Sequence, residues 1–149
     1  MIGRAEYMLS IAESSLSPVS LADTDLPGFK RYIERVPLGV VLVIAPWNFP
    51  YLVSINSVLP AIIAGNAVLL KPSPQTPLVA ERFQRAFEAA GLPKGVIQAI
   101  HLDPQGVEHA IKNPLVNFVS FTGSVGGGRA VEKVAVDAEG FKGVALEVC

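Results

Sequence analysis

From about residue 36 onward, short continuous apolar runs alternate with longer stretches in which apolar residues recur at helical spacing. The apolar runs lie at residues 39–45, 67–70, 96–100, 116–120 and 143–147. Runs of this length are typical of parallel strands that are buried on both faces. The alternation therefore predicts an α/β fold with an open, doubly wound, mostly parallel sheet of about five strands.

The pattern before residue 36 is different. A helix is predicted over residues 1–16 by apolar positions at helical spacing, namely Ala5, Leu9, Ala12 and Leu16. Residues 18–35 are polar and contain turn-forming residues such as Asp23, Asp25 and Pro27, so they indicate a connection without a core of its own. We therefore expect a helix with a connecting segment at residues 1–35 and a compact domain at residues 36–149.

The best-defined helix of the compact part lies between the second and third apolar runs. Thr76 is placed to cap its start and Pro77 suits its first turn. Its apolar face is formed by Val79, Phe83, Phe87 and Ala90. Gly91 and Pro93 then end the helix.

Residues 51–70 are apolar enough to suggest a membrane span, which takes about 20 such residues. Polar and helix-breaking residues interrupt the stretch at Asn56, Pro60, Gly65 and Asn66. A helix buried inside an α/β protein, followed by a turn and a strand, is the better interpretation. We expect no membrane partner.

Charge and cysteine content exclude several other classes. Twelve Lys and Arg residues face thirteen Asp and Glu residues without a basic run, so nucleic acid is not an expected partner. The single cysteine, Cys149, cannot form an internal disulfide, and no secretory signal begins the chain, so we expect a cytoplasmic protein. His101 and His109 lack companions at ligand spacing, which indicates a loop and a helix-surface residue and no metal site.

The segments after the predicted strands are where such folds bind ligands. Asn48 stands between Pro46 and Pro50, where its amide can donate to a developing oxyanion; the alternative is an Asn cap beside a core tryptophan, Trp47. After the second strand, Lys71 and Ser73 suit sugar hydroxyls or phosphate, although an ordinary solvated lysine fits the sequence as well.

The last two strands end in further polar groups. Gly123 and Ser124 are followed by residues 125–128, which contain three glycines, and then by a predicted helix that runs to about residue 136. A hydroxyl with free amides at a helix start suits a phosphate; the alternative is a plain Ser-capped helix after a glycine turn. Glu147 ends the last strand, where partial desolvation would raise its pKa toward that of a general base; the alternative is an ordinary exposed carboxylate.

Taken in order, these segments resemble the aldehyde dehydrogenase superfamily. The resemblance covers roughly residue 36 to the end and rests on the following motifs: Pro37-Leu38-Gly39-Val40-Val41, Ile44-Ala45-Pro46-Trp47-Asn48-Phe49-Pro50, Pro60-Ala61 with Gly65-Asn66-Ala67-Val68, Leu70-Lys71-Pro72-Ser73, Gly91-Leu92-Pro93-Lys94-Gly95-Val96 and Phe121-Thr122-Gly123-Ser124. Any one of them is modest evidence, but six in register are specific.

The resemblance implies the Rossmann-like half of an enzyme that oxidises an aldehyde to an acid with NAD or NADP, through a cysteine thiolate and a thioester. It implies that Asn48 holds the oxyanion and that Glu147 activates water. The implied cofactor contacts are Ile44, Pro46, Trp47, Lys71, Ser73, Gly123 and Ser124. An aldehyde substrate and, for complete members, a homo-oligomer are also implied.

Three departures from the family pattern qualify the resemblance. Pro74 stands where NAD-preferring members often have a glutamate, so NADP stays open, helped by Lys71 and Ser73. Val125, Gly126 and Gly127 replace bulkier types, and because added glycines weaken helix propagation we expect a looser turn at the phosphate site. Cys149 lies too near Glu147 to match the nucleophile, so we expect a truncated member that is inactive alone. The alternative is a non-catalytic dinucleotide-binding or interaction module.

Overall fold

The computed structural model describes residues 1–21 and 28–148. The predicted turn residues Asp23, Asp25 and Pro27 and the terminal Cys149 lie outside the described residues.

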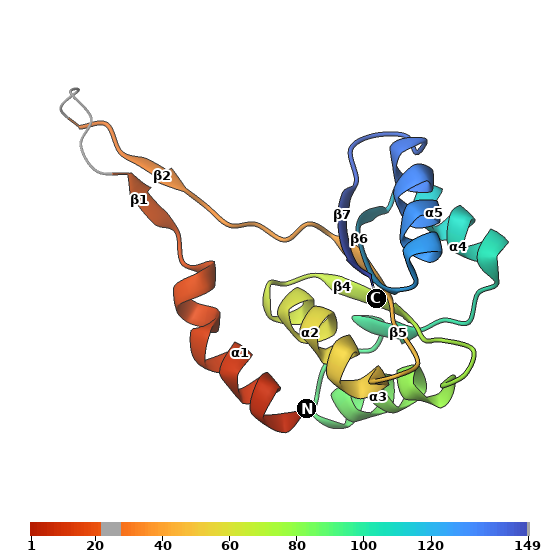
Figure 1. The fold of residues 1–149 in the computed structure, drawn as a ribbon. Coiled ribbons are helices and arrows are strands. Elements are labelled where there is room, and N and C mark those ends of the chain that lie inside the picture. Colours follow the sequence, from red (N-terminus) through yellow and green to blue (C-terminus); the bar gives the residue numbers. More distant parts are fainter. Residues whose placement is uncertain (22–27, 149) are drawn as a thin grey trace.

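A five-stranded parallel sheet forms the centre of the molecule, with the strands in the order β5-β4-β3-β6-β7 (Figure 1). Its strands are β3 (Val40–Ile44), β4 (Ala67–Lys71), β5 (Ile97–Ala99), β6 (Val116–Gly123) and β7 (Gly143–Val148). The apolar runs therefore predicted every strand of this sheet, with small differences at the ends. The predicted α/β doubly wound architecture is confirmed.

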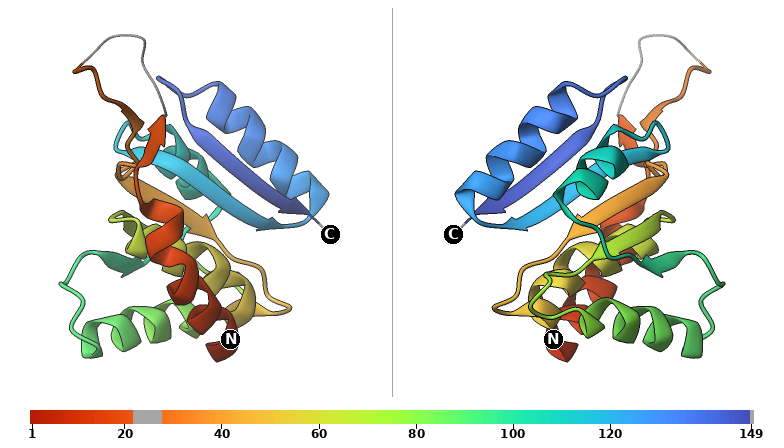
Figure 2. Two further views of the ribbon diagram at one scale, coloured as in Figure 1. Left: turned by 90° about the vertical axis from the view of Figure 1, so that its left-hand side faces the viewer. Right: turned by 90° about the vertical axis from the view of Figure 1, so that its right-hand side faces the viewer.

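Helices cover both faces of the sheet, as Figure 2 shows from two sides. One face carries α2 (Pro50–Ile63) and α3 (Leu78–Ala89), which pack on Val41 and Val43. The other face carries α4 (Pro104–Lys112) and α5 (Val125–Val136), which pack on Leu42 and Ile44. Successive residues of β3 thus supply two separate apolar cores, because neighbouring side chains of a strand point to opposite faces.

The strand order reverses beside β3. From β3 the chain builds outward to β4 and β5, and it then returns to the other side of β3 to form β6 and β7. Neighbouring crossovers at β3 and β6 therefore leave toward opposite faces of the sheet. Open sheets of this kind bind ligands beyond the strand ends at this reversal.

A buried asparagine joins the start of β3 to the end of α2. Asn66 is 5% exposed. Its Oδ1 accepts hydrogen bonds from the backbone N–H groups of Leu38 at 2.6 Å and Gly39 at 3.0 Å. Its Nδ2 donates to the Ala61 carbonyl at 3.0 Å. These bonds set where the central strand begins.

The N-terminal part confirms the predicted helix and corrects the connection. Helix α1 (Ile2–Leu16) packs against α2 and buries Met8. The predicted connection contains an antiparallel pair, β1 (Val19–Leu21) and β2 (Arg31–Ile33), which projects from the body in Figure 1. Strands of three residues are too short to show alternation in the sequence. All six residues are exposed, as expected for a segment without a core.

Two predicted helix starts were wrong. Helix α3 takes Pro77 as its N-cap without a side-chain bond, and the buried Thr76 hydroxyl has no partner within the described residues. Helix α5 begins at Val125, so the three glycines at 126–128 lie inside its first turn and not before it. The stretch predicted to be a buried helix is α2, and no helix in the described part of the chain is long and apolar enough to cross a membrane.

Candidate functional site

The end of β3 leads into the segment with two prolines. Pro46 is buried, whereas Trp47 and Asn48 are exposed. Asn48 Oδ1 accepts a hydrogen bond from the Phe49 N–H at 3.0 Å, and its Nδ2 makes none within residues 1–21 and 28–148. The alternative of an Asn cap beside a core tryptophan is not found, since α2 has no side-chain cap and Trp47 is 59% exposed. The Asn48 donor is thus free to meet a ligand.

The end of β4 supplies a cation. Lys71 is partly buried, and its backbone carbonyl accepts a hydrogen bond from the Ala45 N–H at 3.0 Å. Desolvation by burial lowers the pKa of Lys71 below its ordinary value. Ser73 turns the chain, because its Oγ accepts from the Gln75 N–H at 3.3 Å and its carbonyl accepts from the Thr76 N–H at 3.0 Å. Lys71 is therefore only partly exposed to solvent.

The end of β6 supplies a helix start. Ser124 is the N-cap of α5, and its Oγ accepts a hydrogen bond from the Gly127 N–H at 3.2 Å. The plain Ser-capped helix is therefore present. It does not exclude a phosphate, because a cap satisfies only part of the free N–H groups of a first turn.

Glu147 lies near the end of the edge strand β7 and is exposed. The desolvation that the sequence suggested for this carboxylate is not found, because no described segment covers β7 on its outer side. Glu147 nevertheless lines the same hollow as the residues above.

A cleft of about 650 Å³ unites these four strand ends. All the residues that the sequence assigned to catalysis or cofactor contact line it: Ile44, Pro46, Trp47, Asn48, Lys71, Ser73, Gly123, Ser124 and Glu147. It opens at the reversal of the strand order, beside β3 and β6. The polar cleft, as we call it below, thus joins a cation, an amide, a helix start and a carboxylate.

A second hollow adjoins the polar cleft, and it was not predicted from the sequence. It measures about 580 Å³ and shares Ile44, Lys71, Pro74 and Phe121 with the cleft. Its other walls come from α4 and α5, mainly from Val107, Ile111, Val131 and Val134. The only signal was the helical spacing of these apolar residues, which predicts a buried face but not a gap between two helices. We call this hollow the apolar pocket.

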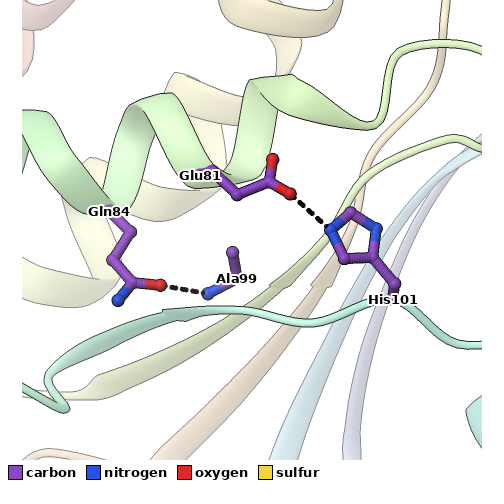
Figure 3. Close-up of polar contacts among 4 residues, drawn as sticks. All are labelled: Glu81, Gln84, Ala99 and His101. Carbon is purple, nitrogen blue, oxygen red and sulfur yellow. Dashed lines mark hydrogen bonds and ion pairs between the residues drawn. The ribbon is translucent and has the colours of Figure 1, made fainter.

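The two histidines lie outside both hollows. His101 follows β5, and its Nε2 lies 2.7 Å from Glu81 Oε1 on α3, as Figure 3 shows. In the same view, Gln84 Oε1 accepts a hydrogen bond from the Ala99 N–H at 2.8 Å. The pKa of Glu81 is lowered, first by a hydrogen bond from its own backbone and then by His101. These contacts tie α3 to the edge of the sheet.

His109 is exposed on α4. Both histidines therefore occupy the loop and helix-surface positions that the sequence predicted. Within the described ranges, no group of three His, Cys, Asp or Glu side chains is placed to hold a metal ion.

The fold is a doubly wound α/β domain with a polar cleft at the reversal of its sheet. The profile described as the Aldehyde dehydrogenase family matches residues 1–149, and the chain belongs to this family. It is 40% identical over 130 residues to a vanillin dehydrogenase of Corynebacterium glutamicum, covering 86% of this chain and 27% of that protein.

Solved structures agree with this assignment. An NAD-dependent benzaldehyde dehydrogenase from Corynebacterium glutamicum superposes with a TM-score of 0.86 at 36% identity, over 99% of this chain and 32% of that one. A succinic semialdehyde dehydrogenase from Streptococcus pyogenes in complex with NADP+ gives a TM-score of 0.87 at 29% identity, over 96% and 30%. The chain thus spans about a third or less of the length of these relatives.

Proposed function

We propose that this chain forms the NAD- or NADP-binding part of an aldehyde dehydrogenase. The observation that carries the proposal is the convergence of four strand ends on one polar cleft at the reversal of the sheet. Relatives named as NAD-dependent or solved with NADP+ support a nicotinamide dinucleotide as the ligand. When bound, such a cofactor supplies the acceptor for a hydride.

The chemistry of the two hollows fits the parts of a dinucleotide. The apolar pocket between α4 and α5 has the apolar walls that a flat base prefers. Lys71 lines both hollows, and its Nζ makes no hydrogen bond within the described part, so it is available to ribose hydroxyls or phosphate together with Ser73. The start of α5 at Gly123 and Ser124 suits the pyrophosphate, with Trp47 alongside.

The nicotinamide half would then lie toward Asn48 and Glu147. The free Asn48 amide would hold the aldehyde oxygen as negative charge develops on it, and Glu147 would take a proton from water. Ile44 and Pro46 line the same cleft. Pro74 offers no carboxylate against a 2′-phosphate, so we propose that both NAD and NADP are accepted.

We further propose that residues 1–149 alone do not oxidise aldehydes. The only cysteine is Cys149, two residues after Glu147, and the family resemblance does not match it to the nucleophile. A cytoplasmic location and the division at residue 35 stay predictions, as does a homo-oligomer for the longer proteins of this family.

Calorimetry with NAD and NADP tests the proposal. Wild-type chain should bind at least one of them, and the fluorescence of Trp47, the single tryptophan, should change on binding because it lines the cleft. Lys71→Ala should weaken binding about tenfold, the worth of one charged hydrogen bond, whereas the exposed Lys94→Ala should not.

Aldehyde added with either cofactor should produce no reduced nicotinamide. Turnover by the wild-type chain would contradict the proposal that residues 1–149 are inactive, and Cys149→Ser would then show whether Cys149 is the nucleophile. Absence of binding to the folded chain would contradict the cofactor assignment. Binding without turnover is also expected of a non-catalytic module. Adding the remaining two thirds of a relative distinguishes the two alternatives, because turnover should return only if this chain is part of an aldehyde dehydrogenase.

A further inference from the structure

One face of α2 continues the polar cleft away from the sheet. Phe49, the N-cap of α2, and Val53 line the cleft. Leu52 and Asn56 share that face by helical spacing and are exposed. The rise from Phe49 to Asn56 is about 10 Å along the helix axis. This face, which we call the α2 strip, therefore leads out of the cleft from the segment that carries Asn48.

The α2 strip exposes apolar side chains at its cleft end. Phe49 is 64% exposed and Leu52 is 41% exposed, and Trp47, just before the helix, is 59% exposed. The side of α2 that packs in the core carries Ile55 and Val58 and is opposite to the strip. Exposed apolar surface that continues a polar site is typical of a surface that takes a ligand. The strip thus suits the apolar body of a molecule whose polar end lies in the cleft.

A cation stands at the far end of the α2 strip. Helix α1 packs against α2, as Figure 1 shows, and Arg4 of α1 meets Asn56 there. Arg4 Nε donates a hydrogen bond to Asn56 Oδ1 at 3.0 Å. The guanidinium carbon of Arg4 also lies 5.4 Å from the centre of the Tyr7 ring, which attracts the cation. These two contacts hold the guanidinium at the end of the strip.

The held guanidinium keeps donors for a ligand. Arginine presents a planar fork of N–H groups, and the bond to Asn56 uses only the one at Nε. Within residues 1–21 and 28–148, no carboxylate forms an ion pair with Arg4. The fork matches the two oxygens of a carboxylate, and a side chain that is already held loses less conformational entropy on binding. Arg4 is therefore complementary to an anionic group at the end of the strip.

We propose that Arg4 is a specificity-determining residue, which selects aldehydes that carry a carboxylate at the end opposite the aldehyde group. The inference rests on the proposed function, which places the aldehyde oxygen at Asn48, and it adds the class of substrate. The α2 strip contacts the apolar body of the substrate, and the Arg4 fork binds the carboxylate. A benzene ring with the two groups at opposite positions has a length of the order of the strip.

A matched pair of aldehydes tests the inference. The compounds 4-formylbenzoate and 4-formylbenzamide have nearly the same shape and the same reactive group, but only the first is an anion. NMR titration of the wild-type chain with NAD added should show 4-formylbenzoate binding about tenfold more tightly, the worth of one charged hydrogen bond. Both ligands are measured on the same protein, so the ratio of the two affinities does not depend on the folded fraction.

Matched substitutions separate the charge of Arg4 from its contact between the helices. Arg4→Gln removes the cation and keeps a hydrogen-bonding side chain, so the preference for 4-formylbenzoate should disappear. Arg4→Lys keeps the charge without the fork, so part of the preference should remain. Arg85→Gln makes the same change of net charge at an exposed arginine of α3 that lines neither hollow, and it should leave the preference unchanged. The Arg4 Nε–H signal should move with 4-formylbenzoate and not with 4-formylbenzamide.

The outcomes distinguish the inference from the function on which it rests. A wild-type chain that binds NAD but binds both aldehydes equally, or binds neither, overturns the inference and leaves the cofactor function standing. A preference that survives Arg4→Gln, or that is lost equally in Arg85→Gln, has the same consequence. A folded wild-type chain without affinity for NAD or NADP overturns the cofactor function itself, and with it the inference.

Discussion

The polar cleft and the apolar pocket meet at Phe121 but take their walls from different parts of the fold. The cleft is built from segments that directly follow β3, β4 and β6, and each segment carries its polar group within a few residues of a strand end. The pocket is built from two helices, α4 and α5, that are connected only through β6. Short motifs can therefore encode the first hollow, whereas the second exists only when two amphipathic faces are brought together.

The difference extends to what holds each hollow in place. Hydrogen bonds and prolines hold the cleft, as at Asn48, Ser73 and Ser124. Side-chain packing holds the pocket, with Ile111 only 1% exposed. Substitutions in the pocket should thus act mainly on stability, and substitutions in the cleft mainly on ligand binding.

The largest expected effect is at Ile111. Ile111→Ala leaves a void in the core beneath α4 and should lower the free energy of unfolding by about 2–4 kcal/mol. Leu115→Ala removes a side chain of the same size that is 72% exposed, and it should change stability by less than about 0.5 kcal/mol. Urea denaturation followed by circular dichroism compares them, and equal losses would show that Ile111 does not hold the pocket.

The two helix caps come next. Asp103 caps α4 beside the pocket, with Oδ1 2.7 Å from the Gly106 N–H, and Ser124 caps α5 beside the cleft. Alanine at either position should cost about 1 kcal/mol of stability. Ser124→Ala should also weaken NAD binding, and more than Asp103→Ala does, because Ser124 lines the cleft proposed for the pyrophosphate and Asp103 only the pocket proposed for the base. Equal effects of both variants on calorimetric affinity would contradict the division between the two hollows.

The Glu81 and His101 pair should give a smaller, pH-dependent effect. The folded state lowers the pKa of Glu81 below its ordinary 4.5, so the stabilisation is present above that pH and is lost as the pH falls through the lower folded value. Glu81→Gln should therefore lower the melting temperature slightly at pH 7 and have no effect in strong acid. Glu132→Gln, an exposed carboxylate on α5, serves as the control. A deficit that persists in strong acid would argue against ionisation as the cause.

The smallest effect is expected from Lys71 in alkaline solution. Burial lowers its pKa below 10.5, so between the folded and unfolded values the unfolded chain binds more protons and stability rises with pH. Lys71→Met should flatten that rise, which denaturation curves across this range can detect. Binding of the cofactor should weaken over the same range as Lys71 loses its charge, and a binding curve independent of alkaline pH would speak against its contact with phosphate.

The sequence alone determined the strands, the polarity of their ends and the family. Continuous apolar runs predict buried parallel strands, because both faces of such strands are covered. Site residues as far apart in the chain as Asn48 and Glu147 could be assigned to one cleft, since parallel strands carry their carboxyl ends to one edge of the sheet. Helix starts were less accurate: Thr76 makes no cap, and α5 begins before its glycines. The backbone turn at Ser73 and the hydrogen bond to Ser124 decide where α3 and α5 begin, against the start that residue preferences predict.

Tertiary structure alone decided the apolar pocket, the exposure of Glu147 and the purpose of the glycine run. Helix propensity alone predicts that Gly127 weakens its helix, because a residue without Cβ loses more conformational entropy when the helix forms. Its space is taken by the Phe121 ring, which reaches it from β6 across the fold. Propensity is a property of neighbours along the chain, whereas the room left for a side chain is set by atoms that only folding brings close.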